Sequence, residues 1–288
     1  MFKQSLMACT LLAVSLGAGA QAATTTTATP TPETQTPAAA APANLSAAEV
    51  VARNAAARGG LQAWRAVQTL SMTGKMEAGG NNRPTIPVPG VKPAQVPNQR
   101  LKEQAQLPFL LELKRPRKMR LELQFNGKTA VQVYDGTNGW KLRPFLNRHQ
   151  VETFTSDELK AASLQADLDG YLIDYAAKGT KIEMQGIEKV ENRDTYKLKL
   201  TLKGGQVEHV WVDAQTFLEA KLDGVPRRMD GKMRSVAVYP REYHTVNGLV
   251  MPYLLETMVE GVKQSEKIHI ESIVVGPKLA DSQFAKLQ

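Results

Sequence analysis

Apolar and polar residues alternate along much of this chain, most clearly in residues 107–144. The apolar positions of one run in this stretch are Met119, Leu121, Leu123 and Phe125. A period of two is typical of a β-strand with one buried face. The turns that follow, Asn126-Gly127 and Asp135-Gly136, are the residue pairs that tight hairpins prefer, because both turn positions take φ > 0. The stretch therefore predicts antiparallel sheet with one apolar and one polar face.

The same alternation returns after residue 180, so we expect about eleven antiparallel strands in all. The predicted helical segments are residues 46–58, 61–66, 156–177 and a terminal turn at 281–287. The first of them begins with Ser46 followed three residues later by Glu49, which is the pattern of a capping box. The predicted fold class is mainly β with helices (α+β).

Four segments make up the predicted domain organisation. Residues 1–22 have a positive residue, a short apolar run and small residues before a cleavage site near Ala22, which is typical of a signal peptide. Residues 23–43 are rich in Thr, Ala and Pro and are predicted to be a disordered linker. Residues 44–288 form the folded domain, interrupted by a proline-rich loop insertion at 81–99. We therefore expect an exported, periplasmic protein.

Cysteine content and charge narrow the class of protein. The single cysteine, Cys9, lies in the predicted signal peptide, so disulfides and thiol chemistry are not expected in the mature chain. The formal net charge is +8. The basic residues are interspersed along the predicted strands, which favours a solubilising surface first and attraction to anionic lipid second. Because export is predicted and nucleic-acid motifs are absent from the sequence, nucleic acid is not an expected partner.

Motifs for catalysis or cofactor binding are also absent from the sequence. Its four histidines, His149, His209, His244 and His269, do not occur at ligand spacing, so neither a metal site nor another cofactor is expected. We therefore predict a protein that is not an enzyme. A hydrolase that uses His244 or His269 with a nearby carboxylate is the least favoured alternative.

A sheet of about eleven strands that is apolar on one side tends to curl as it twists. The few predicted helices could leave a hollow on the apolar side that accepts hydrocarbon. The alternative is a core that the protein's own side chains fill completely, and from the pattern alone this packed core is favoured.

Several short motifs occur in a characteristic order along the chain. They are Gly59 to Trp64 with Thr73-Gly74-Lys75, Arg115-Pro116-Arg117-Lys118-Met119-Arg120, Tyr134-Asp135-Gly136 with Trp140 and Pro144, and the pair of strands joined by Asn247-Gly248. In this order and spacing the motifs resemble those of the LolA/LolB-like outer-membrane lipoprotein-sorting proteins, a family of periplasmic lipoprotein carriers. The resemblance covers most of residues 45–288.

The resemblance implies an incomplete antiparallel β-barrel wrapped around a few helices, with an apolar cavity for lipoprotein acyl chains or lipid. It implies transport to the outer membrane, with an inner-membrane donor complex, an outer-membrane acceptor and a monomeric carrier. It also implies that Arg115 corresponds to an arginine with a role in carrier function. The alternative role for Arg115 is a charge at a strand end that pairs and fixes the turn at Pro116.

The residues predicted to bind the ligand are Arg115, Leu121, Leu123, Phe125, Val131, Val133, Trp140, Leu198, Leu200 and Trp211. The helical segment 156–177, the helical segment 44–66, or both are predicted to cover the cavity. An alternative function on the same fold is a periplasmic sensor or regulatory module that engages a protein partner.

Overall fold

The structure is a computed structural model that describes residues 45–79, 104–144, 148–229 and 231–287. The predicted signal peptide, linker and proline-rich loop therefore lie outside the described residues. The helices are α1 (Ala47–Ala57), α2 (Leu61–Ala66), α3 (Ser156–Gln165) and a terminal 3-10 turn, η3 (Asp281–Phe284). Within the described ranges, none of these helices has the length and apolar character needed to cross a membrane.

Thirteen strands form one antiparallel sheet in the order β6-β5-β4-β3-β2-β1-β13-β12-β11-β10-β9-β8-β7. The strands are β1 (Thr69–Gly79), β2 (Gln104–Lys114), β3 (Lys118–Phe125), β4 (Lys128–Tyr134), β5 (Gly139–Arg143), β6 (Arg148–Thr153), β7 (Lys181–Val190), β8 (Arg193–Thr201), β9 (Val207–Asp213), β10 (Glu219–Met229), β11 (Lys232–Val246), β12 (Leu249–Val259) and β13 (Glu266–Val275). The pairing does not close, since β6 and β7 are the two edges. Strands are sequential neighbours except at the β1–β13 pair, which joins the two ends of the chain.

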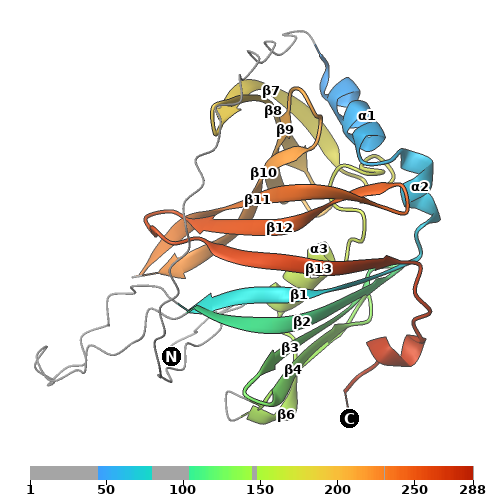
Figure 1. The fold of residues 1–288 in the computed structure, drawn as a ribbon, viewed down its shortest axis with the longest axis vertical. Helices are drawn as coiled ribbons and strands as arrows, with labels where there is room; N and C mark the ends of the chain where they lie inside the picture. Colours follow the sequence, from blue (N-terminus) through green and yellow to red (C-terminus); the bar gives the residue numbers. More distant parts are fainter. Residues whose placement is uncertain (1–44, 80–103, 145–147, 230, 288) are drawn as a thin grey trace, which may run out of the picture.

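The sheet curls around the helical part of the chain, with α3 behind it in Figure 1. This is the expected mainly β fold, an incomplete antiparallel barrel with a few helices. We call the face of the sheet that packs on α3 the inner face and the opposite one the outer face. Apolar residues of α3 and the segment after it, among them Ala162 and Ile173, share a core with sheet residues of the inner face such as Leu123.

Two sequence-based predictions need correction. The strand count is thirteen, and the short edge strand β6 was not anticipated because its sequence, RHQVET, has almost no apolar alternation. The helix predicted over 156–177 ends at Gln165. Residues 166–179 continue as a series of turns, with left-handed backbone at Gly170 and Asp174.

The predicted capping box of α1 is confirmed. The Ser46 hydroxyl accepts from the Glu49 amide, and the Glu49 carboxylate accepts in return from the Ser46 amide. The terminal helical turn is also confirmed as η3, whose Phe284 is buried against the outer face.

Gly59, directly after α1, allows the helix to meet the β11–β12 hairpin. Its φ is +105°, and a Cβ at this position would lie 2.2 Å from the Gly248 carbonyl oxygen. The neighbouring amide of Val250 donates to the Arg58 carbonyl at 3.0 Å, so the two backbones are held together here. Only a residue without a side chain fits between them.

We expect Gly59→Ala to lower the free energy of unfolding by about 2–3 kcal/mol, because it adds both backbone strain and a backbone clash. Gly60→Ala is the matched control. Gly60 also has positive φ (+96°), but its Cβ would meet open space. The control should cost only about 1–2 kcal/mol. Urea unfolding measures both, and equal losses would show that the close approach to Gly248 does not matter.

Candidate functional site

The inner face carries rows of apolar side chains that run across neighbouring strands. In one row, Leu121 of β3 is paired with Leu111 of β2, which is paired with Met72 of β1. A second row continues the band with Leu107, Met76, Ile268 and Leu255 from four strands. Most of these side chains are only half-buried, although they face the core. The inner face is therefore an apolar surface that the rest of the described chain covers incompletely.

Helix α3 and the series of turns after it cover part of this face. Helix α3 and the turns after it place Ala162, Ala166 and Leu168 in the same core as β3 and β4. The N-terminus of α3 is fixed to β5 by a buried ion pair between Glu158 and Lys141. Removal of one partner from such a pair is costly because it leaves a buried charge unpaired. The cover is thus anchored at its start by charge and along its length by apolar contact.

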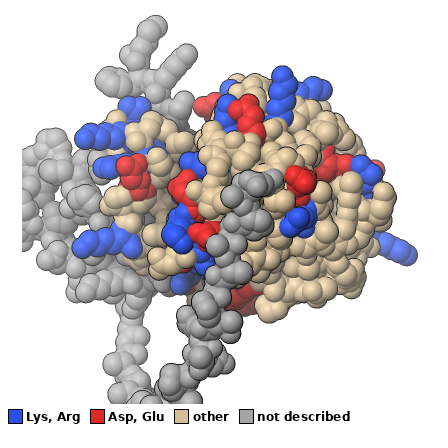
Figure 2. Space-filling view, turned by 90° about the horizontal axis from the view of Figure 1, so that it is seen from above, with Lys and Arg blue, Asp and Glu red and all other residues tan. Residues whose placement is uncertain are grey.

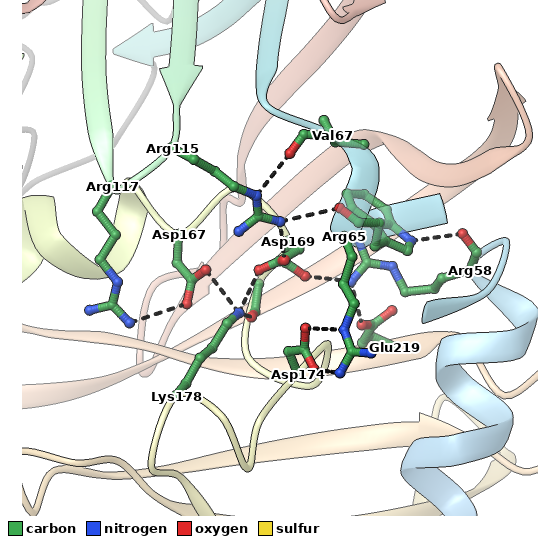
Figure 3. Close-up of polar contacts among 12 residues, drawn as sticks. Arg58, Arg65, Val67, Arg115, Arg117, Asp167, Asp169, Asp174, Lys178 and Glu219 are labelled. Carbon is green, nitrogen blue, oxygen red and sulfur yellow. Dashed lines mark hydrogen bonds and ion pairs between the residues drawn. The ribbon is translucent and has the colours of Figure 1, made fainter. Parts of the chain in front are cut away.

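At one end of the barrel a network of ion pairs joins the sheet to the covering segment (Figure 3). Arg115, at the end of β2, donates to the carbonyl oxygens of Val67 (2.8 Å) and Trp64 (3.2 Å) and to the Asp169 carboxylate. The other oxygen of Asp169 accepts from Lys178, which also pairs with Asp167 at 2.8 Å. We call Arg115, Asp167, Asp169 and Lys178 the latch network.

The two carboxyl groups of the latch network differ in acidity. Burial raises the pKa of Asp167, and this outweighs the attraction of Lys178. Burial acts in the same sense on Asp169, but Lys178, a hydrogen bond from Asp167 and the hydrogen bond from Arg115 together hold the pKa of Asp169 below its usual range. Asp169 is therefore the charged centre of the network. One of its two cations, Arg115, follows strand β2 of the sheet, and the other, Lys178, belongs to the covering segment.

The latch network continues to α1 and to the second half of the sheet. Arg58 donates to the Asp169 carbonyl at 3.0 Å and pairs with Glu219 of β10 at 3.3 Å. Tyr243 of β11 donates to the Glu219 carboxylate at 3.2 Å, and burial raises the pKa of this phenol. An exposed pair, Arg65 with Asp174, lies beside them (Figure 3). Charged groups and their partners from six segments therefore gather at this end of the barrel, and we call it the closed end. The segments are α1, α2, the end of β2, the segment after α3, β10 and β11.

The structure divides the predicted ligand-binding residues between two faces. Leu121, Leu123, Phe125, Leu198 and Leu200 lie on the inner face, the last two in a separate core beneath α1. Val131, Val133, Trp140 and Trp211 lie on the outer face. Arg115 lies at the closed end. The ten residues therefore do not line one cavity.

The four predicted residues on the outer face pack against other parts of the chain. Val131, Val133 and Trp140 pack against Phe284, Leu279 and Leu287 of the chain's C-terminal segment. Trp211 packs with Val190, Ala220 and Tyr239, and the ammonium groups of Lys197 and Lys221 lie 5.0 and 4.0 Å from its ring centroid. These four aromatic and aliphatic side chains thus form outer-face cores.

Other inner-face residues were missed by the sequence analysis. They are Met72, Met76, Leu111, Tyr253 and Ile268. Alternation marks them as facing one side of a strand. The pairing of β1 with β13, almost two hundred residues apart, was needed to place Ile268 and Tyr253 on the same face as the residues of β1 to β3. Asp167, Asp169 and Lys178 were missed because their segment was predicted to be a helix.

A cleft lies at the end of the barrel remote from the latch network, which we call the far end. It has a volume of about 640 Å³ and is lined by residues 105–108 of β2 and 124–129 of the β3–β4 hairpin, with Leu107 and Phe125 among them. Its size falls in the range of small-molecule sites. Through Leu107, which also belongs to the second apolar row, the cleft adjoins the inner face at the end remote from the latch network.

His209, His244 and His269 have separate partners and do not form a cluster. His209 forms a pair with Asp223 at 2.7 Å on β9 and β10, and the His269 ring is 3.5 Å from Glu77. His244 packs edge-on against Tyr253. Within the described ranges, groups of three His, Cys, Asp or Glu side chains that could hold a metal ion are absent. The chemistry that the inner face offers is apolar contact along its rows of side chains.

Comparison with known proteins identifies the fold. Matches were found neither among protein-family models nor among curated protein sequences. A LolA superfamily protein from Nitrosomonas europaea has a TM-score of 0.52 at 12% identity, covering 84% of this chain and 99% of that chain. An outer membrane lipoprotein-sorting protein domain from Vibrio parahaemolyticus has a TM-score of 0.50 at 12% identity, covering 82% and 94%. A DUF1329 family protein from Desulfovibrio piger has a TM-score of 0.52 at 15% identity, covering 82% and 95%. This chain therefore has a LolA-like fold.

Proposed function

We propose that this chain binds the acyl chains of a lipid or lipoprotein on its inner face, without catalysis, and carries them through the periplasm toward the outer membrane. The observation that carries the proposal is the half-buried apolar band, with Met72, Leu111 and Leu121 in one row. Apolar side chains that face a core are ordinarily buried completely. A band that stays half-covered in the interior of a curled sheet is suited to hydrocarbon.

The energetics suit a carrier. Burial of a methylene group is worth about 0.8 kcal/mol, so a sixteen-carbon chain represents roughly 13 kcal/mol of driving force. A carrier that retained all of it would not release its cargo. Displacement of the α3 cover by an entering chain would break apolar contacts such as those of Ala162 and Leu168, which offsets part of the gain. The latch network sets how far the cover moves, and this gives Arg115 its role in the proposal.

Native co-purification and probe displacement test the proposal together. The full chain, purified from the periplasm in mild conditions, is expected to carry extractable lipid that mass spectrometry detects. The delipidated protein is expected to bind a fluorescent fatty acid that unlabelled lipid displaces. Protein that is free of lipid and also indifferent to every acyl probe would overturn the proposal.

A further inference from the structure

Exposed apolar side chains gather at the tip of the β10–β11 hairpin and beside it. Val225 is 51% exposed, Met233 61% and Met258, on the adjacent strand β12, 41%. The other large apolar residues that are this exposed in the described part of the chain lie singly on β7, β9 and β13.

The strand register places Met233 and Met258 on the outer face. Met258 is paired with Ala237, and Met233 lies an even number of residues before Ala237 on the same strand. Val225 lies in the irregular part of β10, between the pairs Gly224–Val236 and Arg227–Arg234. Met233 and Met258 therefore share the outer face of the β11–β12 pair, and the exposed Val225 lies on the neighbouring strand β10.

Basic residues surround these apolar side chains. Residues 225–234 contain Arg227, Arg228, Lys232 and Arg234 but a single acidic residue, Asp230. Arg228 is paired directly with Met233, and Lys232 lies at the exposed tip. In the described ranges, one of these four cations forms an ion pair, Arg227 with Glu266. We call Val225, Arg228, Lys232, Met233 and Met258 the hairpin patch.

The hairpin patch lies at the far end. In Figure 1 the β10–β11 tip and the β12–β13 turn are at the left, and α2 and the end of β2 that bears Arg115 are at the right. Figure 2 shows basic side chains gathered at the same left-hand end of the molecule. The apolar row that contains Met76 and Ile268 approaches this end from inside the barrel.

We propose that the hairpin patch docks the protein onto the surface of an anionic lipid bilayer. Methionine and valine side chains enter the boundary between headgroups and acyl chains, and the arginine and lysine side chains lie among the anionic headgroups. This inference deepens the proposed function, on which it rests, because docking at the far end would bring the inner face to a membrane from which lipid can enter. The patch is positively charged, so it complements an anionic bilayer better than the neutral apolar surface of a protein partner.

Vesicle flotation of the full chain tests the docking surface. The protein is expected to float with vesicles of equal parts phosphatidylglycerol and phosphatidylcholine, to bind vesicles of phosphatidylcholine alone much less, and to be released by salt. Arg228→Gln with Lys232→Gln should weaken partitioning about thirtyfold, since each basic residue near an anionic surface contributes about 1 kcal/mol and 1.4 kcal/mol is a factor of ten. Met233→Gln, with the charges intact, should also weaken it.

The control removes the same charge elsewhere. Lys181→Gln with Lys203→Gln changes exposed lysines of the β7–β8 region and should leave partitioning within about threefold. Equal losses in both double variants would mean that only net charge matters, and failure to bind anionic vesicles would end the proposal. Fatty-acid binding measured without vesicles should be unchanged in the hairpin variants, so failure of docking and failure of acyl-chain binding are distinguished.

Discussion

Asp169→Asn is expected to lower the free energy of unfolding by about 3–5 kcal/mol, because it leaves two partly buried cations facing a neutral amide. The carboxylate is 1% exposed and holds Arg115 and Lys178 at once. Thermal unfolding should show a fall in melting temperature of about 10 °C.

The pH dependence of this effect has a defined sign. The pKa of Asp169 is lowered in the folded protein, so its contribution is present above the ordinary value near 4 and is lost as the pH falls through the folded value. The difference between wild type and Asp169→Asn should therefore be full at pH 7 and shrink below about pH 4. Asp174→Asn is the matched control, since it removes a similar pair, with Arg65, whose partners are more exposed. It should cost less than about 1 kcal/mol. Equal losses at the two positions would show that the latch network is no more than surface charge.

The latch network connects stability to function. Asp167, Asp169 and Lys178 belong to the covering segment, whereas Arg115 belongs to the sheet. Movement of the segment after α3 away from the sheet would separate Arg115 from Asp169 and Arg117 from Asp167, whereas the pairs that Lys178 makes within the segment would stay intact. The buried Glu158–Lys141 pair would still hold the start of α3 to β5. A lipid carrier of the kind proposed above needs contacts that can part and re-form in this way, because capture and release have to alternate.

Local pattern in the sequence was sufficient for the strands and turns. Alternation at Met119, Leu121 and Leu123 predicted β3, and Asn126-Gly127 predicted its hairpin, which the structure confirms. The capping box at Ser46 predicted the start of α1 for the same reason, since all its interactions lie within four residues. Strands, tight turns and helix caps depend on residues that are neighbours in the sequence, so the sequence alone predicts them.

Assignment of residues to the inner or the outer face needed long-range information. On β9, Val210, Trp211 and Val212 are all buried, because both faces of that strand are covered. Alternation has no meaning on such a strand, and Trp211 was predicted to lie on the wrong face. Val131 and Val133 were misplaced because the C-terminal segment, about 150 residues away, makes their face apolar as well.

The segment after α3 shows a different limit of sequence reasoning. Leu164, Leu168 and Leu172 have nearly helical spacing, which predicted a continuous helix. In the structure Asp167 and Asp169 point to Lys178 and Arg115, and Gly170 adopts φ +76°. The contacts made by these charged groups outweigh a weak helical preference. Buried ion pairs between distant segments leave little trace in a single sequence.

Ile268→Glu is expected to weaken binding of a fluorescent fatty acid about a hundredfold or more. Ile268 lies on the inner face of β13, beside Met76 and Leu255, and is half-buried without ligand. The substitution removes an apolar contact worth about 1.5–3 kcal/mol and places a carboxylate that the acyl chain would have to desolvate. Together these effects exceed the 2.8 kcal/mol that corresponds to a hundredfold change in affinity. Fluorescence titration of the delipidated protein measures the change.

The same substitution on the other face of the same strand provides the control. Val274 of β13 is 49% exposed and lies on the outer face, next in sequence to the inner-face residue Ile273. Val274→Glu adds the same charge to the same strand, so it should leave fatty-acid affinity within about twofold, because a solvated carboxylate far from the ligand contributes little. A large loss in Ile268→Glu alone would place the ligand on the inner face. If both variants bind as wild type does, the acyl chain lies elsewhere, and the half-buried apolar band is only an imperfectly filled core.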